Sequence, residues 1–251
     1  MNEYQLIPGI RAAYEILEGQ YLKILELWIS EGRKGSRVRD ILRRAERREI
    51  PVKTMKAGHM DRILPDVAHQ GVVLKAEKYH YADLNRMIDR AVKSKAFGLI
   101  IMADHITDEG NLGALIRTAA FFGANGLVLP KDRSAKMSLG VMKRSAGAFV
   151  HLPIAQVVNL GRTLDTLNEH GFWIIGTAGE SLSSVYEFDW NRNVVLILGS
   201  EDRGLSQSVK KRCHQIIGIP RTGRIDSLNV SVACGVILSE MIRQRTTKTH
   251  E

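Results

Sequence analysis

Three stretches of this sequence place polar side chains directly after apolar runs. The stretches are "ADHITDEGNLGALIRTA", "GSEDRGLS" and "IPRTGRIDSLNVSVACG", and their polar side chains include Asn111, Arg117, Glu201, Ser227 and Asn229. These groups supply amide and hydroxyl hydrogen-bonding groups, one fixed positive charge and one carboxylate. Groups of this kind can bind and orient a polar ligand, provided that the fold brings the three stretches together.

Each stretch also has a purely structural interpretation. Asn111 is typical of a helix N-cap, and Gly123 of a helix that ends in the left-handed conformation. Ser227 or Asn229 could simply start the final helix, whose apolar residues recur on one face. Arg117 differs, because a charge within an otherwise apolar and small helix needs a partner or a functional reason. The three stretches together indicate a site more strongly than any one of them does.

The elements that must position these side chains form an α/β pattern. From Phe97 onward, the apolar runs 97–104, 126–130, 172–178, 194–200 and 215–220 alternate with helical patterns at 113–122, 139–148 and 229–244. Continuous apolar strands separated by helices predict a parallel sheet that is covered on both faces. Ligands bind beyond the carboxyl ends of such strands, which is where the three polar stretches lie.

The N-terminal part has a different pattern of apolar and charged segments, and this pattern predicts a separate, smaller α/β unit. It combines helical patterns at 11–20 and 37–48 with an apolar run at 21–30, typical of a strand or a helix end, and a strand at 69–77. A charged helical segment follows. We therefore predict a small domain over residues 1–77, a linker over 78–96 and a larger domain over 97–251.

The charge of the chain favours an anionic partner. The net charge is +9 in 251 residues, and between Glu31 and Arg62 eleven Lys and Arg stand against five acids. A basic surface attracts polyanions, and the planar guanidinium suits phosphate recognition, so RNA is the leading partner. The alternatives are a solvated helix face with internal ion pairs, an anionic small substrate or a membrane surface.

The sequence lacks the signature motifs of several enzyme classes. There is no GxGxxG, GxxxxGK[ST], GxSxG or HExxH, and the eight histidines show no ligand spacing. Nicotinamide-dependent, P-loop, hydrolase and metalloenzyme interpretations therefore lose their basis, and we expect no metal. Only Cys213 and Cys234 are present, without a disulfide or zinc pattern, and neither a leader nor a long apolar segment is visible. We expect a cytoplasmic protein without a membrane segment.

These motifs resemble the SpoU (TrmH) branch of the SPOUT methyltransferases. The resemblance rests on "NLGALIRTA" with Asn111 and Arg117, "GSEDRGLS" with Gly199 and Glu201, and "SLNVSVA" from residue 227 to 233. The stretches "PGIRAAYEIL" and "HQGVVL" are similar to the small RNA-binding domain of members that methylate a guanosine ribose of 23S ribosomal RNA. The resemblance therefore covers most of the chain.

The resemblance implies transfer of a methyl group from S-adenosylmethionine to a ribose 2′-hydroxyl. It further implies a deep trefoil knot and a homodimer with the active site near the subunit interface. The implied cofactor contacts are Thr177, Gly199, Ile219, Leu228 and Asn229. The implied RNA contacts, which combine the family's pattern with the basic charge, are Arg11, Arg43, Arg44, Arg47, Arg144 and Arg203.

The resemblance also assigns catalytic roles. Arg117 would stabilise the alkoxide and phosphate, since a guanidinium normally only donates hydrogen bonds. Glu201 would orient Arg117 or an RNA group, while Ser227 and Asn229 would shape the knot and the substrate pocket around Asn111. Two alternatives remain open: the same chemistry on tRNA or another ribosomal nucleotide, and a non-catalytic RNA-binding or ribosome-assembly protein.

Three departures from the family pattern concern the target more than the chemistry. Arg11 occupies a usual histidine position, Arg221 stands where methionine is usual, and "DEGN" replaces a proline-containing turn before Asn111. Whether Arg221 and Arg224 contact RNA or only compensate charge stays open at this point.

Overall fold

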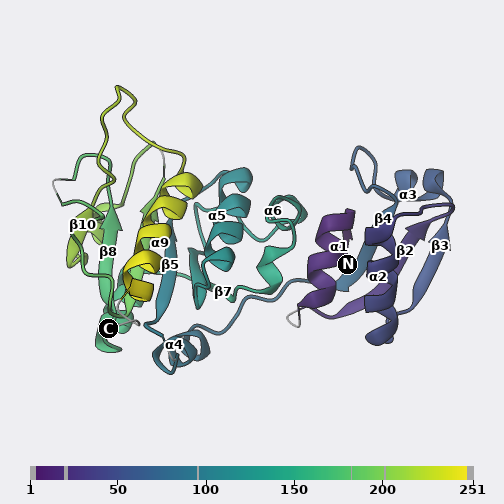
Figure 1. Ribbon diagram of the computed structural model, residues 1–251, viewed down its shortest axis with the longest axis horizontal. Coiled ribbons are helices and arrows are strands. Elements are labelled where there is room, and N and C mark those ends of the chain that lie inside the picture. Colours follow the sequence, from purple (N-terminus) through teal and green to yellow (C-terminus); the bar gives the residue numbers. More distant parts are fainter. Residues whose placement is uncertain (1–3, 20–21, 95, 182, 201, 248–251) are drawn as a thin grey trace. The chain divides into compact units, whose positions relative to one another are not determined.

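A computed structural model describes residues 4–19, 22–94, 96–181, 183–200 and 202–247. The chain divides into two compact units (Figure 1). The first comprises Met1–His80 together with Met137–His151, and the second comprises Tyr81–Lys136 together with Leu152–Glu251. The predicted domain ranges 1–77, 78–96 and 97–251 stay a prediction.

The first unit is built on a four-stranded mixed sheet in the order β1-β4-β2-β3. Strands β1 and β2 run antiparallel to β4, while β2 and β3 are parallel. The strands are β1 (Tyr4–Pro8), β2 (Ile24–Ser30), β3 (Val52–Met55) and β4 (Val72–Glu77). The segment 21–30, for which a strand or a helix end was predicted, thus contributes the strand β2.

Three helices complete the N-terminal part of this unit: α1 (Ile10–Glu18), α2 (Ser36–Arg47) and α3 (Ala57–Ile63). Helix α2 buries Val38, Ile41 and Ala45 and packs against α1. Helix α3 contributes Met60 to a small apolar cluster with Trp28. The unit also includes α6 (Leu139–Arg144) and the short 3₁₀ helix Ala148–Val150, which pack against β1 and α1.

The second unit is built on a six-stranded sheet in the order β10-β8-β9-β5-β6-β7. Every neighbouring pair of strands is parallel. The strands are β5 (Leu99–Asp104), β6 (Gly126–Pro130), β7 (Ile154–Val157), β8 (Trp173–Thr177), β9 (Val194–Gly199) and β10 (Gln215–Ile217). This sheet, together with the mixed N-terminal unit, confirms the predicted α/β class with a parallel sheet.

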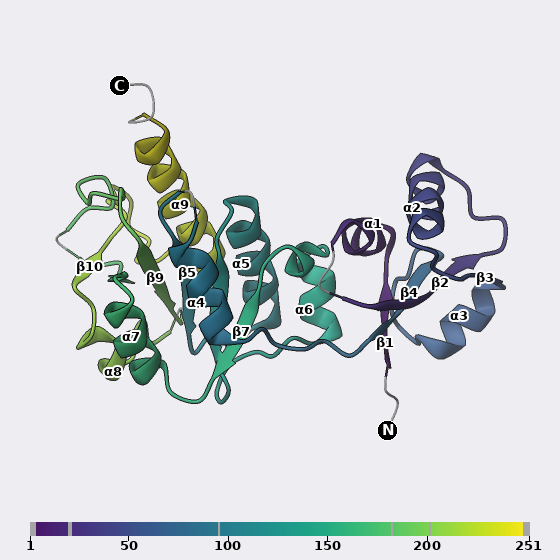
Figure 2. The ribbon, with the colours of Figure 1, turned by 90° about the horizontal axis from the view of Figure 1, so that it is seen from below.

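In the described part of the second unit, five helices cover both faces of its sheet (Figure 2). Helices α4 (Leu84–Val92), α7 (Leu160–Glu169) and α8 (Gln207–Lys210) bury apolar side chains against Ile100, Met102, Val195 and Ile197. Helices α5 (Glu109–Phe121) and α9 (Val230–Thr247) pack against each other. Both faces of the central strands are therefore removed from water, as their uninterrupted apolar sequences predicted.

Helix α5 ends at the predicted glycine, whereas its N-cap is not the predicted residue. Gly123 has φ +72°, its N–H donates to the carbonyl of Ala120, and the N–H of Ala124 donates to the carbonyl of Ala119. This pair of bonds is the Schellman motif, which glycine favours. At the other end the N-cap is Asp108, whose carboxylate accepts from the N–H of Asn111 at 2.7 Å. The interpretation of Asn111 as the cap is wrong.

Candidate functional site

The carboxyl ends of four neighbouring strands bring the predicted cofactor residues to one edge of the sheet. Thr177 at the end of β8 is paired with Ile217 of β10, and Gly199 at the end of β9 is paired with Asp104 of β5. Ile219 follows β10 by two residues. Three of the predicted cofactor residues, Thr177, Gly199 and Ile219, therefore lie at the same edge.

Glycines allow the loops at this edge to pack backbone against backbone. A Cβ at Gly199 would lie 2.3 Å from the carbonyl carbon of Gly204, so no side chain fits there. A Cβ at Gly218 would lie 2.8 Å from the carbonyl oxygen of Ala178. At these two positions the loops can approach each other this closely only because no side chain lies between them.

The final loop also passes close to the loop after β8. A Cβ at Gly179 would lie 2.9 Å from the carbonyl oxygen of Asp226. The loop residues 221–229 are all exposed, and Leu228 keeps 48% of its surface accessible. An exposed leucine beside main-chain groups offers an apolar surface that a ligand could cover.

Asn229 connects the last loop to helix α5. Its side-chain amide donates to Oδ1 of Asn111 at 2.7 Å, across 118 positions of the sequence. Its own Oδ1 accepts from the N–H of Ser231 at 3.0 Å, and its carbonyl accepts from the N–H of Ala233 at 2.9 Å. Asn229 is thus the N-cap of α9 and at the same time joins two of the three polar stretches.

Arg117 lies on the exposed side of α5. The sequence predicted that this charge needs a partner or a functional reason. Because α5 is buried along one side only, the charge is exposed to solvent and needs no partner for burial, while the functional reason stays a prediction. Within the described ranges, the Arg117 guanidinium has no hydrogen bond or ion pair. Ser227 is likewise exposed, and Glu201 lies outside the described residues. Of the five predicted catalytic residues, the structure joins Asn111 and Asn229 directly.

A buried carboxylate at the same edge was missed by sequence reasoning. Asp104 is fully buried, and its Oδ2 accepts from the N–H of Ser206 at 2.6 Å, which fixes the loop after β9. Its Oδ1 lies within hydrogen-bond distance of Nδ1 of His105, whose φ is +62°. Burial, with a smaller effect of Asp104, raises the pKa of Cys213 to about 11. The only sequence signal was an acid at the end of an apolar strand.

The remaining loop arginines are divided by their contacts. Arg221 donates from Nη1 to Oδ1 of Asp226 at 2.7 Å, so its charge is compensated within the loop. Arg224 is exposed, and no ion pair of its guanidinium occurs in the part of the chain that the structure describes. Arg221 therefore closes the loop, whereas Arg224 is accessible to a ligand.

The predicted RNA contacts differ in their surroundings. Arg11, Arg43, Arg47, Arg144 and Arg203 are exposed. Arg44 instead pairs with Glu18 and stacks on the ring of Tyr14 at 3.8 Å from its centroid. Its charge is engaged within the first unit, so its contacts are those of a residue that holds α2 to α1.

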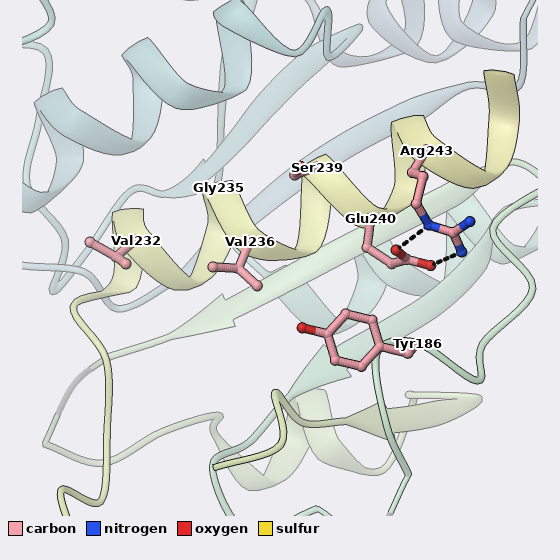
Figure 3. A pocket seen from close by; sticks show the side chains of 7 residues that line it. All are labelled: Tyr186, Val232, Gly235, Val236, Ser239, Glu240 and Arg243. Atoms are coloured by element: carbon pink, nitrogen blue, oxygen red, sulfur yellow. Dashed lines mark hydrogen bonds and ion pairs between the residues drawn. The ribbon is translucent and has the colours of Figure 1, made fainter. Parts of the chain in front are cut away.

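A groove beside α9 is lined by other residues (Figure 3). Tyr186 faces the helix across it, Val232 and Val236 line it, and Glu240 forms a two-bond ion pair with Arg243. No predicted catalytic or cofactor residue lines this groove. Its exposed apolar side chains suit a protein contact better than a small polar ligand.

Among the described residues, no group of three or more His, Cys, Asp and Glu side chains is placed to hold a metal ion. None of the helices in the described ranges combines the length and the apolar character that crossing a membrane requires.

Comparison with known proteins identifies the family. The SpoU rRNA Methylase family matches residues 98–239, more than half of the chain. The chain belongs to this family. Residues 6–82 match a second family, described as RNA 2′-O ribose methyltransferase substrate binding. The family resemblance inferred from the three motifs is confirmed.

Relatives of this SpoU-family chain extend over nearly its whole length. The 23S rRNA (guanosine-2′-O-)-methyltransferase RlmB of Pseudomonas putida is 35% identical over 248 residues, which are 99% of this chain and 100% of that protein. An uncharacterized tRNA/rRNA methyltransferase of Synechocystis is 39% identical over 96% of this chain, which spans only 62% of that relative.

The structure also matches solved SpoU structures. The SpoU methyltransferase AviRb from Streptomyces viridochromogenes, crystallised in complex with AdoMet, superposes with a TM-score of 0.80 at 25% identity. The match covers 98% of this chain and 92% of that one. The likeness therefore includes both units of the SpoU-family chain.

Proposed function

We propose that this chain methylates the 2′-hydroxyl of a guanosine ribose in 23S ribosomal RNA, with S-adenosylmethionine as methyl donor. One observation carries the proposal: a substrate-binding family and the SpoU methylase family match the same chain in succession, at residues 6–82 and 98–239. The RlmB relative, similar over the full length of both proteins, supports the guanosine target.

The cofactor would bind at the carboxyl edge of β8, β9 and β10. Thr177, Gly199, Ile219, Leu228 and Asn229 would hold it, chiefly through main-chain groups. Two features fit such a ligand: glycines that let the loops at this edge pack closely together, and the accessible side chain of Leu228. S-adenosylmethionine supplies an electrophilic methyl group on a sulfonium.

The chain's own residues would prepare the ribose hydroxyl. Arg117, exposed and unpaired within the described ranges, would donate hydrogen bonds to the alkoxide as it develops and to the neighbouring phosphate. Asn229 would hold Asn111 through the bond between their side chains. Ser227 would line the pocket beside them. Glu201 would orient Arg117 or an RNA group.

The finer architecture belongs to the same proposal. We expect residues 219–229 to complete a trefoil knot, and the passage of Asp226 beside Gly179 supports that threading. We expect a homodimer that uses the groove beside α9, where Val232 and Tyr186 are 51% and 54% exposed. A cytoplasmic location follows from a ribosomal RNA substrate.

A methyl-transfer assay tests the proposal. The full chain is incubated with radiolabelled S-adenosylmethionine and either 23S ribosomal RNA or tRNA, and the RNA is digested to nucleosides. We expect 2′-O-methylguanosine from 23S ribosomal RNA. Label only in tRNA would replace the substrate. Methyl groups on bases would overturn the chemistry, and cofactor binding without any transfer would favour a non-catalytic RNA-binding protein.

A further inference from the structure

Helix α2 carries arginines that its contacts divide into two groups. Arg44 pairs with Glu18 and stacks on Tyr14. Arg48, directly after the helix, donates from Nη1 to the carbonyls of Ile16, Leu17 and Gly19 at 2.9 to 3.2 Å. These two side chains satisfy groups at the end of α1 and hold α2 against it. Their role is structural.

The second group points away from the unit. Arg39, Arg43 and Arg47 recur every four residues and are all exposed. Four residues advance a helix by about 6 Å and turn it by about 40° beyond a full turn, so the three side chains share one side. The residues that α2 buries, Val38 and Ala45, occupy the opposite side.

Repulsion among these three positive charges lowers the stability of α2. Like charges at a spacing of four residues destabilise a helix by about 0.2–0.5 kcal/mol per pair, and the row contains two such pairs. Arg43 forms an ion pair with Asp40 that measures 3.8 Å, with side chains 71% and 47% exposed. An exposed pair of this kind contributes little. Folding therefore gives no reason for the row.

We infer that Arg39, Arg43 and Arg47, called the arginine row below, bind successive phosphates of the RNA substrate. Guanidinium groups one helical turn apart can each contact a phosphate oxygen, and such contacts set register without reading bases. The inference rests on the proposed function and deepens it. It adds Arg39 to the predicted contacts and removes Arg44 from them.

The salt dependence of RNA binding measures these contacts. Each phosphate neutralised adds about 0.7 to 0.9 to the slope of log affinity against log salt. We therefore compare the full chain with R39A/R43A/R47A, using a 23S ribosomal RNA transcript and filter binding from low to high salt. We expect the slope to fall by about 2 and the affinity at about 0.1 M salt to fall at least about tenfold.

A matched control removes three exposed charges elsewhere. Arg86, Arg90 and Lys93 lie on or directly after α4 and are exposed. The variant R86A/R90A/K93A loses the same net charge, and we expect its slope to match that of the unchanged chain. R39K/R43K/R47K keeps the charge of the row, and its slope should stay unchanged. Arg44→Ala should lower the melting temperature and leave the slope unchanged.

The outcomes separate this inference from the proposed function. An unchanged slope in R39A/R43A/R47A, or an equal fall in both alanine triples, would overturn the arginine row while the unchanged chain still binds and methylates RNA. A chain that binds no RNA at all would overturn the proposed function and the row together. Far-ultraviolet circular dichroism, equal in all variants at the temperature of the binding assay, shows that each remains folded.

Discussion

The two units present different kinds of surface to a ligand. In the first, long cationic side chains extend from α2, with Arg43 71% exposed in its side chain. In the second, the loops that follow β8, β9 and β10 pack closely at glycines, and a single Cβ at Gly199 would meet backbone at 2.3 Å. Long side chains can follow a flexible polyanion, whereas closely packed loops fit a ligand of one shape. Substitutions in the first unit should therefore reduce RNA binding step by step, whereas a single substitution in the second unit should have a large effect on cofactor binding or methyl transfer.

The largest effect should come from Arg117. We expect Arg117→Ala to lower kcat for methyl transfer by about 100-fold to 1,000-fold, since it removes a donor to the developing oxyanion. Because the Arg117 guanidinium forms no hydrogen bond or ion pair within the described ranges, cofactor affinity by calorimetry should change less than about twofold. Turnover equal to that of the unchanged chain would refute the assignment.

The next largest effect should come from adding a methyl group at Gly199, where the loops pack closely. Gly199→Ala should cost about 1–3 kcal/mol in the free energy of unfolding, because overpacked backbone must shift, and it should weaken cofactor binding strongly. Gly223→Ala is the control, because a Cβ there meets no atom within 4 Å. Equal melting temperatures and equal cofactor affinities for the two variants would contradict the claim that close backbone packing at Gly199 is needed for stability and cofactor binding.

The bond between Asn229 and Asn111 can be separated from the helix cap. Serine at position 229 can cap α9 but cannot reach across, so Asn229→Ser should keep the melting temperature and lose methyl transfer. Asn229→Ala should also cost about 1 kcal/mol of stability. Full activity of the serine variant would show that the bond to Asn111 is dispensable.

The smallest effect concerns acid stability of the first unit. Hydrogen bonding from Trp28, followed by Lys53 and Lys75, lowers the pKa of Glu26 to about 2. A lowered folded pKa adds stability that is complete above the ordinary value near 4.5 and is lost as the pH falls towards 2.

Denaturant unfolding at pH 7 and pH 3 measures that contribution. Glu26→Gln should be less stable at pH 7, by about 1 kcal/mol after allowance for solvent screening, and the difference should shrink at pH 3. Glu31→Gln, at an exposed carboxylate without a described ion pair, should show no such difference. A Glu26 penalty that is equal at both pH values would contradict the role of its charge.

The sequence was most informative where a segment is buried on both faces. Strands such as Leu99–Asp104 and Val194–Gly199 are continuous apolar runs, so the parallel sheet was predictable. Strand Val52–Met55 is mostly exposed and strand Ile154–Val157 has only four residues, so neither gives a periodic signal. The helix Leu160–Glu169 was also missed, because polar residues interrupt its apolar face.

The candidate site was predictable as a set of loops but not as a set of contacts. The carboxyl edge followed from the parallel pattern, because the polar stretches come directly after apolar strands. The bond from Asn229 to Asn111 joins loops far apart in sequence, and Arg44 pairs with Glu18 of another helix. Such pairings depend on side-chain directions in the folded chain, which charge and spacing alone do not define.

Ribose-methylation mapping in cells tests the central claim most directly. Total RNA is compared between cells that carry the gene, cells that lack it and cells that carry Arg117→Ala. The account predicts that one 2′-O-methylguanosine in 23S ribosomal RNA is present only with the unchanged gene. Identical ribose-methylation maps in all three strains, or a lost mark confined to tRNA, would contradict it.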